Sequence, residues 1–282
     1  MNGIPRLLAA LLVVALTGCA SLVGKATDGL SRDLAAGILD SDDPETVAAG
    51  LPSYLILLDG LITGDPKNAN LLLAASKLYG AYAGSFVTDP QRRLRLALRT
   101  ESYARRAVCA RDTRLCDALD KPYDEFVAAA NASKDTVLLH GLASAWVVAI
   151  QSDSENFDRL AALPKVQVLF ERVVALDAGF DHGSALMYLG VIDCLRPEAL
   201  GGNPVRGIER LDRAIAQDSA RNLMPKVLEA QYCARLTYNQ ELHDKLLEEV
   251  LAAPVRSVGL TLQNTLAQRM AHDLVKSGKD YF

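Results

Sequence analysis

The chain has 282 residues and a formal net charge of -4 at pH 7, with 50% hydrophobic and 23% charged residues. This balance is typical of a globular protein with enough apolar material for a core, and the length suits one large domain or two small ones. The slight acidity argues against a nucleic-acid-binding surface, so we expect no nucleic acid among the partners.

The N-terminus has the pattern of an export signal. Arg6 precedes an apolar run from Leu7 to Leu16, and Gly18 stands directly before Cys19. The run is too short to cross a bilayer as a helix, which takes roughly 20 residues, but it suits the apolar part of a signal peptide. The pattern resembles a bacterial lipobox, which predicts a lipoprotein signal peptide at residues 1–18 and lipidation of Cys19. The alternatives are an ordinary cleaved signal peptide or an internal cysteine.

Lipidation of Cys19 predicts a chain that is exported to the periplasm and tethered to a membrane by its N-terminus. Multiple acyl chains give stable anchoring, whereas a single chain binds only marginally. Ala20 follows Cys19, and the absence of Asp there resembles lipoproteins that are sorted to the outer membrane. We expect residues 19–42 to form the lipid-anchored tether and a first helix. We expect no later segment to be apolar enough to span a membrane.

The rest of the chain is dominated by helix signals. Asp or Asn precedes proline at four places, and such a pair is typical of a helix N-cap followed by the first helical residue. The four pairs are Asp43-Pro44, Asp65-Pro66, Asp89-Pro90 and Asn203-Pro204. Pro52 should kink or restart its helix, because proline lacks the backbone donor. No alternating strand pattern with hairpin turns occurs, so the sequence predicts an all-α fold.

A loose helix–turn–helix repeat recurs along the chain. Its turns include Asp177, Asp218 and Pro254, whose spacing is close to the roughly 34-residue period of tetratricopeptide hairpins. The tetratricopeptide consensus is poorly kept. We therefore expect residues 43–282 to form a single domain of degenerate tetratricopeptide-like helical hairpins stacked into a superhelical array, with a generic helical bundle as the alternative. The polar stretch from Gln151 to Leu163 indicates an insertion between repeats.

Beyond Cys19 the chain has four cysteines, an even number that in an exported protein is compatible with disulfides. Cys109 and Cys116 could staple a helix-to-helix turn, and Cys194 and Cys233 fall at similar positions in successive repeats. The alternative is four buried free thiols, and the sequence leaves both open. No CxxC spacing supports a metal site, so we expect no metal.

Motifs of catalysis are missing from the sequence. It has no GxSxG elbow, HExxH pair, Walker loop or GxGxxG turn, and its four histidines are scattered without ligand spacing. Because no nucleophile–base or metal constellation is present, we expect a non-enzymatic protein without a cofactor, and an enzyme is the least favoured hypothesis.

Binding is the alternative to catalysis. Stacked helical hairpins form concave surfaces or channels that suit peptides, partner proteins or apolar ligands. Six aromatic residues are candidates for lining such a cavity, although ordinary core packing also explains each of them. They are Tyr54, Tyr79, Tyr82, Phe86, Trp146 and Tyr188. A basic series forms either a solvated helix face or a surface that docks a partner. Its members are Arg92, Arg93, Arg95, Arg99, Arg105 and Arg106.

Several segments together resemble one family, the T-component of tripartite ATP-independent periplasmic (TRAP) transporters. No single motif is diagnostic, but their order and spacing behind a lipobox are specific, and the resemblance runs from about Asp40 to the C-terminus. The segments are Leu61–Asn68, Leu71-Leu72, Tyr79, Tyr82-Ala83, Phe86, Ala145-Trp146, Ala162–Pro164, Leu176-Asp177, Gly183, Gly201-Gly202 and Leu262–Ala271.

The resemblance implies a lipid-anchored periplasmic protein of tetratricopeptide-like hairpins, assembled as a homotrimer with a central pore and cavities that open onto it. It also implies association with the solute-binding protein of the transporter and the shelter or relay of a small apolar ligand. No catalytic residue comes with the family. The extra cysteines and the Asp181-His182 turn depart from what the family leads us to expect. The alternative function is a general tetratricopeptide-like scaffold lipoprotein for envelope assembly.

Overall fold

The computed structural model describes residues 36–282, and within this range every regular element is a helix. The all-α prediction is therefore confirmed. Cys19 and the predicted signal peptide lie outside the described residues. In chain order the helices are α2 (Pro44–Gly64), α3 (Ala69–Phe86), α4 (Pro90–Arg111), α5 (Thr113–Ala118), α6 (Tyr123–Ala132), α7 (Thr136–Ser152), α8 (Phe157–Leu160), α9 (Leu163–Leu176), α10 (Phe180–Asp193), the 3-10 helix η1 (Glu198–Leu200), α11 (Pro204–Gln217), α12 (Met224–Leu228), the π-helix η2 (Glu229–Ala234), α13 (Gln240–Ala252) and α14 (Thr261–Tyr281).

Side-chain caps set where several helices begin. Asp43, Asp89 and Asn203 each accept a hydrogen bond from a backbone N–H of the first turn, and a proline follows each of them. The same prediction is wrong for Asp65-Pro66. Asp65 is the C-cap of α2, and its backbone N–H donates to the carbonyl oxygen of Leu61. Asn68 caps α3 instead, because its side chain accepts from two N–H groups of the first turn.

Two expectations bear on the helix α2. It continues through Pro52 as one helix, so the proline does not restart it. By length and composition α2 is also apolar enough to cross a membrane, with a mean hydropathy of 1.5. We expected no such segment, and the expectation failed because Glu45 and Asp59 are the only charges along this helix. Leu51 and Leu55 pack into the core, and the opposite face of the helix is exposed.

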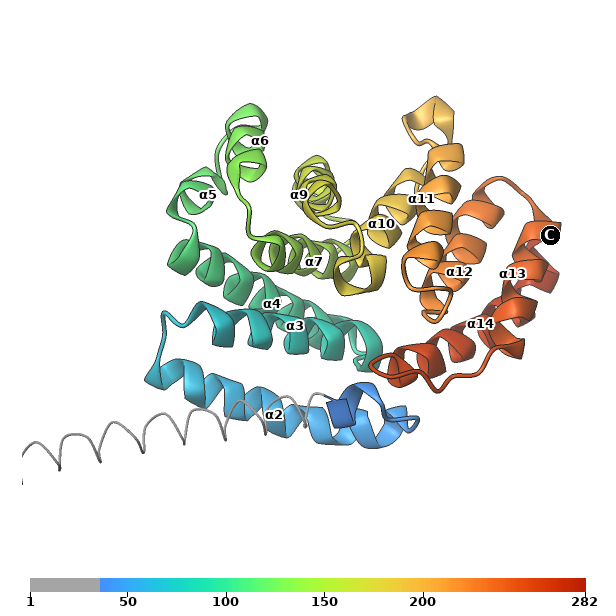
Figure 1. Cartoon of the computed structure of the whole chain (residues 1–282), viewed down its shortest axis with the longest axis horizontal. Coiled ribbons are helices and arrows are strands. Elements are labelled where there is room, and N and C mark those ends of the chain that lie inside the picture. The colour runs from blue at the N-terminus through green and yellow to red at the C-terminus, as the bar shows by residue number, and fades with distance from the viewer. Residues whose placement is uncertain (1–35) are drawn as a thin grey trace, which may run out of the picture.

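The helices pack as consecutive pairs that follow one another around an arc (Figure 1). The predicted hairpin turns at Asp177, Asp218 and Pro254 join the packed pairs α9–α10, α11–α12 and α13–α14. Helix α4 packs on both α3 and α7, and the short helices α5 and α6 lie between α4 and α7 in the chain. The polar insertion predicted at residues 151–163 contains the short helix α8.

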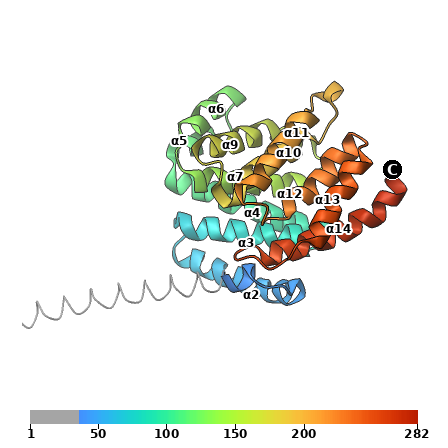
Figure 2. The same ribbon diagram turned by 45° about the vertical axis from the view of Figure 1, so that its right-hand side comes forward.

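The arc returns to its start. Helix α14 contacts α2, and the two views place it beside the blue N-terminal helix (Figures 1 and 2). Arg256 donates to Asp42 at 2.6 Å, and Arg269 donates to Glu45 at 2.5 Å. Leu262 of α14 belongs to the same apolar cluster as the inner side of α2. Charge pairs at the surface and apolar contact beneath them therefore join the first and last helices.

The apolar core has three parts. The largest cluster runs from α2 to α10 and includes Leu72, Leu142 and Phe170, which are fully buried. One smaller cluster joins α10, α11 and η2, and another joins α12, α13 and α14. The N-terminal region (α2–α10) therefore has a continuous core, whereas the C-terminal region (α11–α14) is built on two small ones.

Two glycines let α10 and α11 touch. A Cβ at Gly190 would lie 2.8 Å from the carbonyl oxygen of Gly207, and a Cβ at Gly207 would lie 2.9 Å from the carbonyl oxygen of Gly190. Any larger residue at either position would push the backbones apart. The close approach brings the end of α10 against the start of α11, where a disulfide and a buried carboxylate lie.

Candidate functional site

The six aromatic residues proposed as a cavity lining are spread over the helical stack. Tyr54 is on α2, Tyr79, Tyr82 and Phe86 are on α3, Trp146 is on α7 and Tyr188 is on α10. Tyr82 packs on Phe86 with ring centroids 6.2 Å apart, and Tyr188 stacks on Phe170 at 4.8 Å. Trp146 is the member of the six that lines the cavity described next.

A cavity of about 510 Å³ lies between α4, α7 and the segment that contains α8 and α9. This volume is in the range of small-molecule sites. Its apolar wall comes from Trp146, Ala149 and Ile150 of α7 and from Leu119, directly after α5. Trp146 is 5% exposed, and its ring centroid lies 5.7 Å from that of Phe126. The side chains of this wall are therefore part of the packed core, and one side of them faces the cavity.

The same cavity has a charged lining, whereas the family resemblance led us to expect an apolar one. The charged residues are Glu101, Arg105, Asp120, Asp158, Arg159 and Lys165. Arg159 donates to Asp153 at 3.0 Å and to Glu101 at 3.4 Å. Arg105 donates to Asp120 at 2.5 Å. The arrangement can hold a ligand that has both a charged group and an apolar part.

Lys165 lies at the start of α9 and reaches back to the turn after α5. Its ammonium donates to the carbonyl oxygens of Leu119 at 3.2 Å and Lys121 at 2.7 Å. Burial lowers the pKa of Lys165, because desolvation disfavours the charged form. Neither Arg159 nor Lys165 was singled out from the sequence. The polar insertion at residues 151–163, which folds over the cavity, is a signal that could have found Arg159, whereas Lys165 lies beyond it on α9.

The carboxylate of Asp59 joins three helices. It accepts hydrogen bonds from the hydroxyls of Tyr79 at 2.7 Å and Tyr103 at 2.5 Å, and it pairs with Arg99 at 2.9 Å. Burial raises the pKa of both tyrosines, and the hydrogen bond to the carboxylate raises it further. Tyr79 therefore holds α3 against α2. Tyr103 and Arg99 hold α4 against α2 in the same way.

The outward face of α2 is apolar. Ile56 is 72% exposed, Leu57 is 55% exposed and Leu61 is 47% exposed. We call these three residues the α2 face. Arg92 and Arg95 are exposed near the start of α4, which packs mainly on α3 and α7. An exposed apolar patch marks an interaction site, so the α2 face is a candidate for docking a partner.

Three successive residues at the start of α10 adopt a left-handed backbone. Asp181, His182 and Gly183 have φ values of 48°, 60° and 75°. Residues with side chains rarely take this conformation, so neighbouring groups must hold it in place. Lys77 of α3 pairs with Asp181 at 3.4 Å, and His182 pairs with Asp218 at 3.2 Å. The turn therefore links α10 to α3 and to the end of α11.

His140 of α7 lies beside this turn. Its Nε2 is 2.7 Å from the hydroxyl of Ser184 and 4.0 Å from the carboxylate of Asp181. Burial lowers the pKa of His140 to about 4, so the ring is neutral at neutral pH. In a catalytic triad the serine and the carboxylate bind opposite nitrogens of the imidazole. Here both approach the same nitrogen, so the geometry does not support nucleophilic catalysis.

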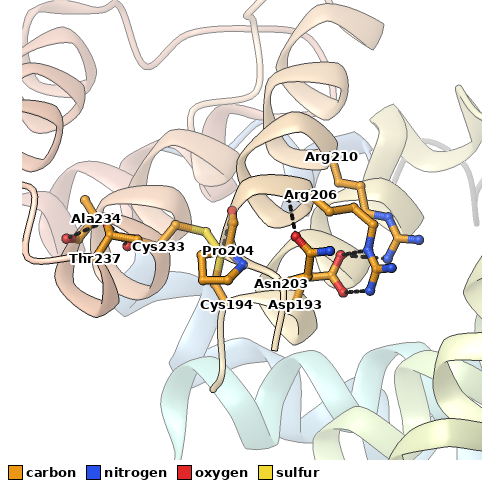
Figure 3. Close-up of a disulfide and its surroundings, with 9 residues drawn as sticks. All are labelled: Asp193, Cys194, Asn203, Pro204, Arg206, Arg210, Cys233, Ala234 and Thr237. Atoms are coloured by element: carbon orange, nitrogen blue, oxygen red, sulfur yellow. Dashed lines mark hydrogen bonds and ion pairs between the residues drawn. A yellow bond between two sulfur atoms is a disulfide. The ribbon is translucent and has the colours of Figure 1, made fainter. Parts of the chain in front are cut away.

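Two disulfides cross-link the chain. Cys109 and Cys116 are joined across the turn between α4 and α5, and they are 7 residues apart in sequence. Cys194 and Cys233 are joined between the end of α10 and η2, over a separation of 39 residues (Figure 3). The second bridge crosses from the N-terminal region to the C-terminal region.

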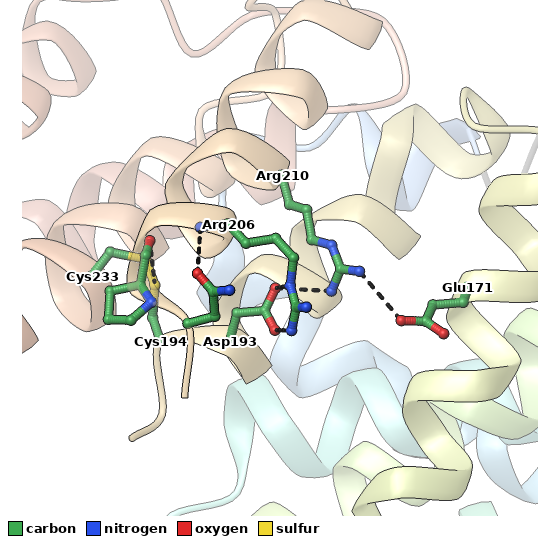
Figure 4. A network of polar contacts seen from close by, with 8 residues as sticks. Glu171, Asp193, Cys194, Arg206, Arg210 and Cys233 are labelled. Carbon is green, nitrogen blue, oxygen red and sulfur yellow. Dashed lines mark hydrogen bonds and ion pairs between the residues drawn. A yellow bond between two sulfur atoms is a disulfide. The ribbon is translucent and has the colours of Figure 1, made fainter. Parts of the chain in front are cut away.

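Asp193 is buried next to this second bridge, with 2% of its surface exposed. Its carboxylate accepts hydrogen bonds from Arg206 at 2.9 and 2.6 Å and from Arg210 at 2.8 Å (Figure 3). Arg210 continues to Glu171 of α9 at 3.2 Å (Figure 4). The hydrogen bond to Asp193 raises the pKa of Arg206. Because both carboxylate oxygens are paired, this group holds α9, α10 and α11 together.

Within the described part of the chain, no group of three or more His, Cys, Asp or Glu side chains is placed to hold a metal ion. The family model for the TRAP transporter T-component matches residues 40–282, which is almost the whole range that the structure describes. No curated protein matches the chain.

Proposed function

This chain belongs to the TRAP transporter T-component family, as its sequence predicted, and we propose that it is a non-enzymatic accessory T-component of a TRAP transport system. In this role it docks the solute-binding protein and shelters or relays an apolar ligand through a cavity or pore. The observation that supports the proposal most directly is the family match over residues 40–282. The cavity beside Trp146 supports the sheltering of a ligand, although its charged lining does not fit a purely apolar one.

We infer that the helix pairs are degenerate tetratricopeptide-like repeats stacked into a superhelical array, and that residues 43–282 form one domain. The coincidence of the predicted hairpin copies with packed helix pairs supports this architecture. The contact between α14 and α2 supports a single domain, because it joins the two ends of the array.

We propose that Cys19 is the lipid attachment site and that it holds the chain in the periplasm at the outer membrane. The pattern from Arg6 to Cys19 supports this proposal. Mass spectrometry of the membrane-extracted protein tests it, with a diacylglycerol-modified Cys19 expected at the mature N-terminus. An unmodified mature N-terminus contradicts the anchor. An unchanged amount of membrane-bound protein after Cys19→Ser contradicts it too. The family resemblance further supports a homotrimer, which sedimentation of the Cys19→Ser protein would measure.

We propose that the α2 face docks the solute-binding protein. Its aliphatic side chains have no cover within the described residues. A partner with an apolar patch of its own fits this surface, since apolar burial supplies affinity.

The experiment is a binding titration between the Cys19→Ser protein and the solute-binding protein of its own TRAP system. We expect saturable binding that Leu57→Glu weakens strongly, because the new charge must be buried in the interface. Val205→Glu is the matched control, since Val205 is 63% exposed on α11, away from α2. Equal binding by both variants would move the docking surface elsewhere. Recovery of envelope-assembly proteins without any solute-binding protein would favour the scaffold function.

A further inference from the structure

The cavity beside Trp146 is asymmetric in where its charges lie. Of its charged lining, Arg105, Arg159 and Lys165 are half-buried, whereas Asp120 and Asp158 are exposed. Desolvated charges act more strongly than solvated ones, because the surrounding medium screens them less. The interior of the cavity is therefore more positive than the count of charged residues suggests.

The remaining half-buried acid of the lining, Glu101, shares Arg159 with Asp153, which accepts from Arg159 at 3.0 Å. Glu101 accepts from Arg159 at 3.4 Å, and both side chains are 23% exposed. A cationic ligand would have to separate this pair, and it would meet Lys165 and Arg105 at the same time. The lining therefore disfavours a cation and favours an anion.

Asp120 occupies the position that such an anion would take. Its carboxylate accepts from Arg105 at 2.5 Å, yet its side chain is 82% exposed while that of Arg105 is 30% exposed. An exposed ion pair of this kind contributes little to stability and exchanges readily. Lys165 is close enough to both groups for each to influence its pKa. A carboxylate from solution could replace that of Asp120 without leaving Arg105 unpaired.

The geometry points to a ligand-binding site for a small organic anion with an apolar body. The anionic group of the ligand takes the place of Asp120 on Arg105, and the apolar body packs against Trp146 and its neighbours on α7. Apolar burial supplies the affinity at about 25 cal/mol per Å², and the Arg105 exchange supplies the selectivity for charge. This inference rests on the ligand-sheltering part of the proposed function and names the chemical class of that ligand.

The test uses the fluorescence of Trp146, which is the single tryptophan of the chain. The Cys19→Ser protein is titrated with sodium octanoate, and separately with octan-1-ol, octylamine and acetate. We expect a saturable change with octanoate, and at equal concentration little change with the neutral, cationic or short analogues. Equal responses to octanoate and octan-1-ol would overturn the anion site, because they would show that apolar burial alone explains binding.

Substitutions in the Arg105–Asp120 ion pair should change the affinity for octanoate in opposite directions. Asp120→Asn removes the internal competitor, so the affinity for octanoate should rise by roughly threefold, on the scale of a partly exposed ion pair. Arg105→Gln should lower the affinity by at least as much. Arg256→Gln is the matched control, because Arg256 forms an exposed pair with Asp42 away from the cavity and should leave the titration unchanged.

A lower affinity for octanoate in Asp120→Asn would overturn the proposal, since an acid that helps to bind the anion contradicts the exchange. This outcome does not depend on Arg105→Gln folding correctly. The titration contains no other subunit of the transporter, so its failure and the failure of partner docking are separate results. A protein that binds octanoate but no solute-binding protein would keep this site and contradict the T-component role.

Discussion

The N-terminal and C-terminal regions of this protein are held together by different means. In the N-terminal region one cluster of apolar side chains extends from α2 to α10. In the C-terminal region the apolar clusters are small, and several polar residues are fully buried among them. Glu229 is 1% exposed, and His243 and Asn264 are 0% exposed. The Cys194–Cys233 bridge crosses the boundary between the regions.

The difference indicates a division of roles. The cavity beside Trp146 and the α2 face both belong to the N-terminal region, where continuous apolar packing holds the walls of a site in place. The C-terminal region mainly brings α14 back to α2. Because a small apolar core supplies limited stability, this region depends on specific links, and each link can be removed individually to measure its contribution.

The largest effect should follow removal of the bridge between the regions. Loop-closure entropy assigns roughly 4 kcal/mol to Cys194–Cys233, with its separation of 39 residues, and roughly 2.5 kcal/mol to Cys109–Cys116, with 7. We expect the double variant Cys194→Ala with Cys233→Ala to unfold at lower urea concentration than Cys109→Ala with Cys116→Ala. An equal loss in both variants would show that the C-terminal region does not depend on its bridge.

The next largest effect concerns a buried amide on α14. Asn264 accepts from the N–H of Leu223 at 3.0 Å and donates to the carbonyl oxygens of Arg221 at 2.9 Å and Val255 at 3.2 Å. Asn264→Ala should cost about 3 kcal/mol of unfolding free energy, because the buried N–H of Leu223 and two part-buried carbonyl oxygens lose their partner.

Ser76 provides the matched comparison in the N-terminal region. It is 3% exposed and makes a single bond to the carbonyl oxygen of Thr100 at 2.9 Å. We expect Ser76→Ala to cost about 1 kcal/mol in the same urea titration. If Ser76→Ala proved as costly as Asn264→Ala, the two regions would depend on buried polar contacts to the same extent.

A smaller effect should depend on pH. The pKa of Glu229 is raised from 4.5 to about 7, mainly by burial and also by the nearby Asp212 and Glu249, against the opposing Lys226 and Lys245. A raised pKa in the folded state means that the Glu229 contribution is complete below about pH 4.5 and is lost as the pH rises through about 7. Glu229→Gln cannot ionise and should be more stable than the wild type at pH 8, by about 1 to 3 kcal/mol.

Urea unfolding of the wild type and Glu229→Gln at several pH values from 5 to 8 measures this difference. The two proteins should converge toward the acid end, because Glu229 is then protonated in the folded state. Parallel pH profiles would mean that Glu229 ionises as an ordinary surface carboxylate. Glu229 would then no longer distinguish the C-terminal region from the N-terminal one.

The sequence predicted the helices of both regions well, because their signals are local. Asp43, Asp89 and Asn203 cap the helices that follow them, and the hairpin copies coincide with packed pairs. The failure at Asp65-Pro66 has a local cause too. Asn68, three residues later, offers a better cap for α3, and the cap pattern alone does not rank the two.

Apart from the two cysteine pairs, contacts between helices could not be predicted from the sequence. The bonds from Arg206 and Arg210 to Asp193 depend on the close approach of α10 and α11 at Gly190 and Gly207. No periodicity in one chain reveals that approach. In the cavity Trp146 was a candidate. Its charged neighbours come from the insertion, which contributes Asp158 and Arg159, and also from α4, the turn after α5 and α9, so their meeting depends on tertiary packing.

The smallest effect tests how the two regions are joined at the ends of the array. Arg269 and Glu45 form a bidentate pair at 2.5 and 2.8 Å, but both side chains are largely exposed. Leu262 of the same helix is 9% exposed within the N-terminal cluster. Exposed pairs are screened by salt and ordering them costs side-chain entropy, so Arg269→Gln should leave Tm unchanged at physiological salt.

Leu262→Ala, in contrast, should lower stability by about 2 kcal/mol or more, because it removes buried apolar contact between α14 and the large core. Thermal unfolding of the two variants at low and high salt separates these contributions. A clear loss of Tm in Arg269→Gln, larger than that in Leu262→Ala, would mean that charge rather than packing closes the array. The C-terminal region would then be attached to the N-terminal one by polar links at both of its ends, at α14 as well as beside Cys194.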